Sequence, residues 1–303
     1  MNKIRQNLFP ILAAIIWGLA FSAQSDCAVK GMEPFTFNML RALIATVVLF
    51  FVAIIFSKGF SSIKAQLSDK QYVKNLLLGG LCCGTALFLA SNLQQAAFSS
   101  DTESGKVGFI TVFYLMLVPI FGLFIKKKAT LNVWISVVIA LVGMYFLCIE
   151  GGASFKINIH DLFAFLCAIM FAIQILFIDH FANKVNGIHL SFMQFLVVTV
   201  FSFVIMLFRE SPTLALIKDC FWQVAYVGVF SSGVAYTLQI LAQRGSNPTV
   251  VSLLLSLESV FAVIFGALLL GEVMSAREYI GCGIMFLAVI LAQIPIRSRS
   301  NEK

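Results

Sequence analysis

Residues 34–56 have the sequence PFTFNMLRALIATVVLFFVAIIF, an apolar run in which Arg41 is the single charged residue. A helix of this length rises far enough to cross a hydrocarbon core about 30 Å thick. The sequence contains further runs of the same kind, and we expect ten spans, near 8–28, 34–56, 73–96, 104–125, 131–149, 160–179, 188–208, 220–243, 248–270 and 279–296. With 60% hydrophobic and 12% charged residues overall, the sequence predicts an all-α membrane protein embedded in a lipid bilayer.

Basic residues collect in every second connection between the spans. If the N-terminus is cytoplasmic, the cytoplasmic segments carry 14 basic and three acidic residues, and the outer segments carry six basic and ten acidic residues. Cytoplasmic loops of membrane proteins retain an excess of Lys and Arg. We therefore expect both termini to be cytoplasmic. The net charge of +7 then reflects topology and indicates no nucleic-acid partner.

Two charged residues, Arg41 and Glu258, remain inside the spans. Arg41 lies seven residues after Pro34, and Glu258 lies ten residues into its span, near the midplane. An ionisable group at such depth is costly and marks a functional site by default. A buried carboxyl favours its neutral form and can carry a proton. Three alternatives stay open: Arg41 could fix helix packing through backbone carbonyls, Glu258 could be a hydrogen-bonded structural acid, or the two could pair.

The two halves of the chain resemble each other in order. The matching segments are 14–18 with 168–172, Gly84 with Gly233, and 118–122 with 258–262. This register makes Val118 the counterpart of Glu258. We assign one five-helix repeat to residues 1–150 and a second to residues 151–303. Because five is odd, the second repeat must be inverted in the membrane, as in secondary transporters that bind substrate at the midplane between their halves.

Polar and aromatic side chains within the spans mark an expected substrate pathway. The candidates are Trp17, Arg41, Asn92, Gln95, Tyr114, Gln174, Tyr236, Gln239 and Glu258. Asn92 and Gln95 share one helix face near the outer end of their span, and Tyr236 and Gln239 share a face towards the inner end of theirs. Inversion would place these two clusters at opposite mouths of one path. Hydrogen bonds between helices are the alternative use of such amides.

Pro119 and two glycines predict local features of the helices. Proline in a helix interior removes a backbone donor, so we expect Pro119 to bend or break the fourth span. Such a discontinuity near the midplane frees backbone groups for substrate. Gly80 and Gly84 form a GxxxG motif, which permits close helix approach.

The sequence lacks the motifs of several other protein classes. No Cys/His cluster has the spacing of a metal site, no phosphate-binding or dinucleotide fingerprint is present, and no Ser/His/Asp set suggests a hydrolase. We therefore expect no metal, no cofactor and no enzymatic activity.

Several short motifs resemble those of a known family. They are Trp17-Gly18, Leu40-Arg41, Leu93-Gln94-Gln95, the run from Gly105 to Thr111, Leu117-Val118-Pro119, Leu257-Glu258 and Gly271-Glu272. Together, over about residues 8–296, the chain resembles the EamA-like branch of the drug/metabolite transporter superfamily. The resemblance implies a 5+5 inverted-repeat fold, the bacterial plasma (inner) membrane, and export or exchange of small metabolites. The family usually has Glu-Pro in the ninth helix, where this chain has Glu258-Ser259.

These observations favour a secondary carrier that exports small metabolites, such as amino acids or related compounds, by alternating access. A small molecule is the expected partner, the proton is a candidate coupling ion through Glu258, and the chain is expected to be a monomer or homodimer. Three alternatives stay open: an uptake or exchange carrier for another metabolite or drug class, a membrane sensor or scaffold that moves nothing, and an intramembrane enzyme. Measured flux separates the carriers from the other two.

Overall fold

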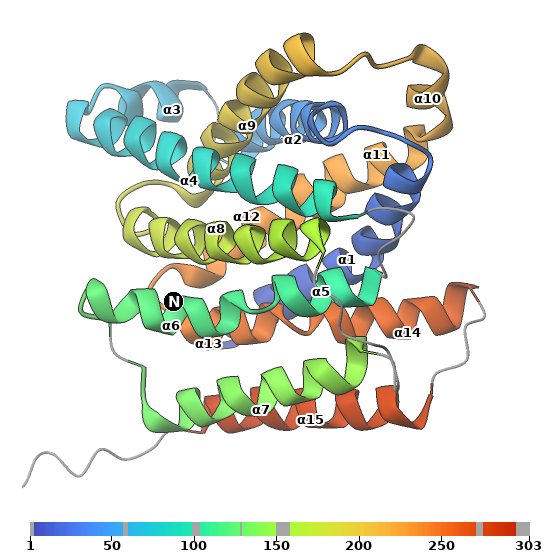
Figure 1. Cartoon of the computed structure of the whole chain (residues 1–303). Coiled ribbons are helices and arrows are strands. Elements are labelled where there is room, and N and C mark those ends of the chain that lie inside the picture. The colour runs from blue at the N-terminus through green and yellow to red at the C-terminus, as the bar shows by residue number, and fades with distance from the viewer. Residues whose placement is uncertain are drawn as a thin grey trace, which may run out of the picture.

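The computed structural model describes residues 3–56, 60–98, 104–127, 129–149, 158–270 and 275–294. Within these ranges every regular element is a helix (Figure 1). The predicted all-α class is therefore confirmed for the described chain.

Nine helical segments of the described ranges are long and apolar enough to cross a membrane. They are built from α1 (Lys3–Val29), α2 (Pro34–Phe56), α4 (Lys70–Ala97), α5 (Ser104–Thr111) with α6 (Tyr114–Phe124), α8 (Ile159–Phe181), α9 (Gly187–Arg209), α11 (Phe221–Tyr226) with the π-helix η1 (Val227–Ala235) and α12 (Tyr236–Gln243), α13 (Pro248–Leu255) with α14 (Glu258–Leu270), and α15 (Ala276–Gln293). The expected span 131–149 corresponds to α7 (Leu131–Cys148), whose apolar part, Leu131–Leu147, is shorter than the other nine.

Two short helices lie in the connections. The first, α3 (Phe60–Leu67), lies between α2 and α4. The Asp69 side chain then accepts a hydrogen bond from the backbone N–H of Gln71 and caps the start of α4, as short acidic side chains do at helix N-termini. The second short helix is α10 (Leu214–Asp219), before α11.

The outer surface of the bundle is apolar. Large hydrophobic side chains such as Phe51, Ile55, Phe124 and Phe208 are more than half exposed. A soluble monomer rarely exposes so much contiguous apolar surface. Lipid is the environment in which this surface is stable.

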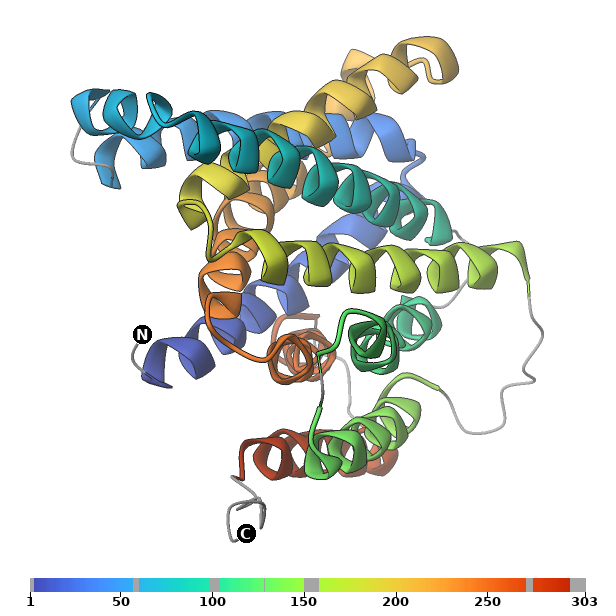
Figure 2. The same cartoon turned by 90° about the vertical axis from the view of Figure 1, so that its left-hand side faces the viewer.

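Contacts between the two halves of the chain come in matching pairs. α4 packs against α8 and α9, and the segment formed by η1 and α12 packs in the same way against α1 and α2. The contact of α1 with α14 is matched by the contact of α5 and α6 with α8. Two pairs match themselves: α2 with α9 along one edge of the molecule and α7 with α15 along the opposite edge (Figures 1 and 2). The packing therefore repeats when the helices of the first half are exchanged with those of the second half.

Close approach of α4 and α9 depends on the GxxxG motif. A Cβ atom placed at Gly84 would lie 2.6 Å from Cβ of Val197 and 2.8 Å from the carbonyl oxygen of Gln194. Real Cβ atoms do not come this close, so only glycine fits. The predicted close approach through Gly84 is confirmed.

The first described helix, α1, begins on the side of the bundle where the last one, α15, ends. The Asn7 side-chain amide of α1 donates a hydrogen bond of 2.7 Å to the side-chain oxygen of Gln293 at the end of α15. Both ends of the described chain therefore lie on one face.

Candidate functional site

The fourth and ninth spans are each interrupted in the middle. The fourth consists of α5, which ends at Thr111, and α6, which begins at Tyr114. The ninth consists of α13, which ends at Leu255, and α14, which begins at Glu258. Because the fourth and ninth spans are counterparts in the packing, the two interruptions are counterparts as well.

Both interruptions are turns tighter than an α-helix. In the fourth span, the N–H of Phe113 donates to the carbonyl of Ile110, three residues back, at 3.1 Å. In the ninth span, the N–H of Leu257 donates to the carbonyl of Leu254 at 3.4 Å, again three residues back. This is the 3₁₀ pattern, which in the middle of a helix is frequent at functional hinges.

The position of the first interruption differs from the expected one. Pro119 lies inside α6, and the interruption falls at residues 112–113, more than one helical turn earlier. The structure also shifts the register of the repeats by one turn, since the residue that begins the second half-helix is Tyr114 in the fourth span and Glu258 in the ninth. Val118, the counterpart predicted from sequence, lies four residues further on. Apolar helices match almost equally well when displaced by one turn, which is why sequence alone chose the wrong turn.

A cavity lies where the two interruptions meet the rest of the bundle. The four residues that flank the interruptions, Thr111, Tyr114, Leu255 and Glu258, all line it. The remaining lining residues come from both halves of the chain: Trp17, Phe21, Gln24, Arg41, Gln94, Phe171, Ile175, Ser231, Tyr236 and Gln239. Both halves of the chain therefore build the wall of this one cavity.

Arg41 is the cation of this cavity. Its residue is only 3% exposed, and one guanidinium nitrogen donates a 2.9 Å hydrogen bond to the side-chain oxygen of Gln24. The guanidinium carbon lies 5.9 Å from the centre of the Phe37 ring, and Nε has no hydrogen-bond partner. Within the described chain, Arg41 forms no ion pair with a carboxylate. A buried charge without a counterion is costly unless a ligand or water completes it.

Glu258 is the acid of the same cavity and opens α14 with its side chain partly exposed. Its side chain makes no hydrogen bond or ion pair to any other described residue, Arg41 included. The hydroxyl of Tyr236 is in electrostatic contact with both Arg41 and Glu258. The two charges therefore face the cavity separately, with a phenol near both, and the direct pair considered from sequence is not formed.

Close packing of α1 holds Glu258 in place. A Cβ atom at Gly18 would lie 2.8 Å from the carbonyl oxygen of Glu258, 2.8 Å from the backbone nitrogen of Ala262 and 2.7 Å from Cβ of Phe261. Two of these three atoms belong to the backbone of α14 and cannot rotate away. Only glycine at position 18 permits this approach.

Aromatic rings form much of the cavity wall. Trp17 and Tyr236 meet edge to face with ring centroids 4.8 Å apart, and the indole N–H of Trp17 donates to the carbonyl of Ser231 at 3.3 Å. Tyr114 and Phe171 meet with ring centroids 6.4 Å apart. Trp17 and Phe171, which the sequence match of 14–18 with 168–172 paired, therefore both line the cavity.

Ser231 belongs to a feature that the sequence did not predict. The eighth span changes from α-helix to the π-helix η1 over Val227–Ala235 before it continues as α12. Its counterpart in the first half, α4, is α-helical throughout. π-Helical turns are rare and frequent at functional sites. The run Ser231-Ser232-Gly233 within an apolar span is the one sequence signal that could have drawn attention to this segment.

Three of the candidate residues lie in the protein around the cavity and do not line it. Asn92 of α4 accepts a hydrogen bond from the side chain of Asn38 at 3.2 Å, and Gln95 donates to the carbonyl of Gln24 at 3.1 Å. Gln174 of α8 accepts from Gln239, which does line the cavity, at 3.5 Å. These amides join neighbouring helices, which was the structural alternative considered for them. Gln24, Gln94, Thr111 and Ser231 line the cavity and were not among the candidates.

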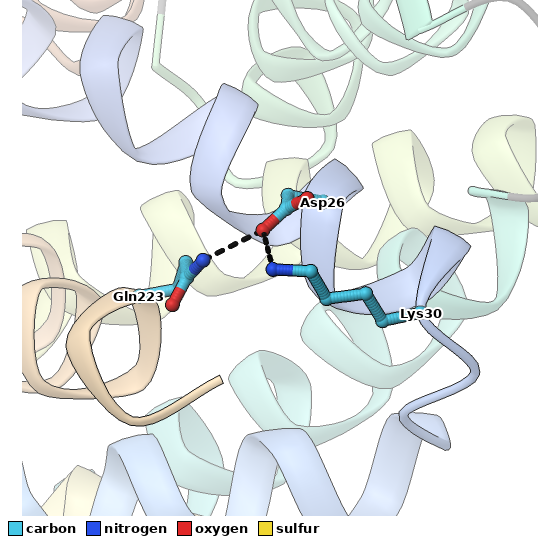
Figure 3. A network of polar contacts seen from close by, with 3 residues as sticks. All are labelled: Asp26, Lys30 and Gln223. Atoms are coloured by element: carbon cyan, nitrogen blue, oxygen red, sulfur yellow. Dashed lines mark hydrogen bonds and ion pairs between the residues drawn. The ribbon is translucent and has the colours of Figure 1, made fainter. Parts of the chain in front are cut away.

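A polar network lies at the far end of α1 from Asn7, beyond the cavity (Figure 3). One carboxylate oxygen of Asp26 accepts hydrogen bonds of 2.6 Å from both the Lys30 ammonium and the Gln223 side-chain amide. The bond from Lys30 to Asp26 raises the pKa of the lysine above its ordinary value. Because Gln223 belongs to α11, this network joins the first and eighth spans.

An apolar, multi-pass helix bundle whose two halves pack alike and whose interrupted helices meet at a central cavity is the architecture of a membrane transporter. The model of the EamA-like transporter family matches residues 5–149 and 158–293. The chain belongs to this family, and the two matched segments confirm its two-repeat architecture. The expected family is thus confirmed.

Two relatives are named as transporters. The chain is 31% identical over 302 residues to an uncharacterized transporter of Archaeoglobus fulgidus, covering 98% of this chain and 88% of the relative. It is 25% identical over 288 residues to the uncharacterized transporter YoaV of Bacillus subtilis, covering 90% and 93%. A crystal structure described only as that of a protein superimposes with a TM-score of 0.74 at 17% identity, over 95% of this chain and 96% of that one. This last likeness concerns the fold alone.

Proposed function

We propose that this chain is a secondary carrier that exports small metabolites, such as amino acids or related compounds, by alternating access. The central cavity is its substrate site. One observation carries the proposal: the matched interruptions of the fourth and ninth spans both open onto a cavity that holds an uncompensated arginine and a free acid. Discontinuous helices that present backbone and charge at the middle of a bundle are characteristic of secondary transporters.

The alternation requires two inverted repeats of five helices, which we assign to residues 1–150 and 151–303. The contacts of α4 with α8 and α9 match those of η1 and α12 with α1 and α2, and this match supports the exchange of roles. α7 then serves as the fifth transmembrane helix despite its shorter apolar part, because it packs along its length against α15, the tenth. The odd number of helices in each repeat makes their orientations opposite.

Two hydrogen-bonded seams supply the gates in this mechanism. In the first half, the Gln95 amide of the third span donates to the carbonyl of Gln24 in the first span at 3.1 Å. In the second half, the Gln243 amide of the eighth span donates to the carbonyl of Ile175 in the sixth span at 2.9 Å. Inversion places these equivalent seams at opposite ends of the cavity. Opening one while the other stays closed would expose the cavity to one side at a time.

The orientation follows from charge. The ends of the described chain meet at the face where α1 begins and α15 ends. These terminal segments are among the segments that are rich in Lys and Arg. Placing that face in the cytoplasm satisfies the retention of positive charge. We assign the protein to the bacterial plasma (inner) membrane with both termini cytoplasmic.

Glu258 is the proposed site of proton coupling. Other titratable or charged groups near it are Tyr114 on α6, Cys167 on α8, Tyr236 on α12 and Arg41 on α2. Phenols, thiols and guanidinium groups ordinarily titrate above neutral pH. Glu258 is the one carboxyl of this set, and we assign to it the exchange of the proton that links substrate movement to a proton gradient.

Efflux from cells tests both the transport and the coupling. Cells that express the chain are loaded with dipeptides, and the medium is profiled by mass spectrometry over a range of external pH. We expect release of a defined metabolite class whose rate depends on pH. In Glu258→Gln this pH dependence is lost, whereas the matched control Asp219→Asn, at an exposed position outside the cavity, keeps it. A Glu258→Gln variant with an unchanged pH profile rules out the coupling role.

The same assay separates the alternatives. Uptake without efflux would assign the chain to import or exchange. Binding without movement in either direction, with the protein present in the membrane, would favour a sensor or scaffold.

A further inference from the structure

The two charges of the cavity have no charged partner within the described chain. Arg41 is 97% buried, its Nε has no hydrogen-bond partner, and its hydrogen bonds go to neutral groups, the side-chain oxygen of Gln24 and the hydroxyl of Tyr236. Glu258 faces the same space with its carboxylate free of hydrogen bonds and ion pairs to described residues. The cavity therefore presents one positive and one negative pole, and no side chain of the described chain neutralises either.

We propose that the cavity selects a small zwitterion, with the carboxylate of the ligand on Arg41 and its ammonium group on Glu258. This inference rests on the proposed function, since it takes the cavity as the transport site. It goes further by assigning the orientation of the ligand and the residue that holds each of its charged groups. The juxtaposition of the two unpaired poles around one cavity carries it.

Charge balance favours a zwitterion over ligands with a single charge. A monoanion bound at Arg41 would leave the charge of Glu258 unpaired, and a monocation at Glu258 would leave Arg41 unpaired. Removing one partner of a buried ion pair is strongly destabilising, because an isolated charge remains out of water. A ligand that carries both charges satisfies both poles in one binding event and adds no net charge to the membrane interior.

The chemistry of each pole suits its assigned group. Guanidinium offers several N–H donors in one plane and matches the two oxygens of a carboxylate. An ammonium group offers three donors, and carboxylate oxygens accept them. Aromatic faces also attract ammonium groups, and Trp17 and Tyr236 lie side by side in this wall, 4.8 Å between ring centroids. The Tyr236 hydroxyl, in electrostatic contact with both poles, is placed to bond the ligand between its two charges.

Proteoliposomes separate the inference from the proposed function. Purified protein is reconstituted into liposomes loaded with the proteinogenic amino acids and a protein-free extract of cellular small molecules, and released compounds are identified by mass spectrometry against empty liposomes. We expect the released compounds to be zwitterions. Release of only uncharged or singly charged compounds would leave the carrier standing and overturn the zwitterion. Release of nothing, from protein that melts cooperatively, would refute the proposed function itself.

The orientation is tested on the unmodified protein first. For the zwitterion that is released, its carboxamide has lost the carboxylate and its N-acetyl derivative has lost the ammonium group. We expect each derivative to compete at least about tenfold less well than the parent, the size of a lost bond to a charged group. Competition by either derivative equal to that of the parent overturns the assignment of its pole.

Two variants then assign each pole to its residue. Arg41→Gln should lose the preference for a carboxylate over a carboxamide. The carboxamide and the parent should then compete equally well, while the N-acetyl derivative stays weak. Glu258→Gln should show the converse. Arg209→Gln, at an exposed arginine of α9, is the matched control and should behave as the wild type. Equal loss for both derivatives in both variants would indicate a structural role for the charges and overturn the assignment.

Discussion

The contact between α1 and α14 at Gly18 provides a prediction in which packing and function are linked. Replacing Gly18 with alanine adds one Cβ atom, which would lie 2.7 Å from Cβ of Phe261 and 2.8 Å from both the Glu258 carbonyl oxygen and the Ala262 nitrogen. Carbon atoms pack best at about 3.5–4.0 Å. The two helices must therefore separate by roughly 0.8 Å or more at this point, because two of the three atoms belong to backbone.

The cost follows from this overlap. Forcing an extra carbon into a well-packed interior costs about 1–3 kcal/mol. Alanine is about 1 kcal/mol better than glycine in a helix, which offsets part of that cost. Gly283 on α15 is a matched control, because a Cβ there would meet nothing within 4 Å. In Gly283→Ala only the higher helix propensity of alanine changes the free energy of unfolding. The difference in stability between the two variants therefore isolates the steric cost at position 18.

We expect Gly18→Ala to melt at a lower temperature than Gly283→Ala when both are purified in the same detergent. We also expect slower release from proteoliposomes, because the displaced backbone includes the carbonyl of Glu258 and moves this acid relative to Arg41. Displacements near 1 Å at a reacting group can cost about a hundredfold in rate. Equal melting temperatures and equal flux for the two variants would refute the argument that this contact positions the acid.

Two further changes test the cavity and the network beyond it. Tyr236→Phe removes the hydroxyl near both charges and should weaken zwitterion competition by about fivefold to tenfold, the effect of one neutral hydrogen bond, whereas the exposed Tyr279→Phe should leave it unchanged. Asp26→Asn should lower the raised pKa of Lys30 to its ordinary value, measured by NMR on ¹³C-methylated lysine. The pKa of Lys30 is higher in the folded protein than in the unfolded chain. The contribution of Lys30 to stability is therefore present below the unfolded pKa and is lost as the pH rises through the folded pKa. An unchanged Lys30 pKa in Asp26→Asn would contradict the Asp26 bond as its cause.

Sequence predicted the helices well because a membrane span is defined by length and hydrophobicity. The run 34–56 was expected as a span, and α2 occupies Pro34–Phe56. Where prediction went wrong, the cause was local geometry. The interruptions at 112–113 and 256–257 lie next to neither proline nor glycine, so nothing in the sequence marks them. They are tight turns stabilised by bonds three residues back, and such turns are selected by the packing of whole helices.

The candidate site residues were also predicted in part. Arg41 and Glu258 were chosen because a charge in the membrane interior must face other protein or a cavity, and the structure places both in one cavity. Asn92 and Gln95 were chosen as polar side chains on one helix face, and the structure places them in hydrogen bonds between helices. An amide can satisfy itself against a neighbouring helix, whereas a lone charge cannot. A charged residue deep inside a span therefore predicts a cavity-lining position more reliably than an amide residue does.

The structure also explains how a nearly symmetric bundle can bind a ligand in one orientation. The fourth and ninth spans are interrupted at matching places, yet the residue that opens the second half-helix is the neutral Tyr114 in one and the acidic Glu258 in the other. The eighth span is π-helical where its counterpart α4 is not. In the proposed carrier, symmetry of the backbone would supply the two conformations of similar energy that alternating access requires. The departures from symmetry include side chains and one helical segment that line the cavity, so a polar ligand would meet different chemistry at its two ends.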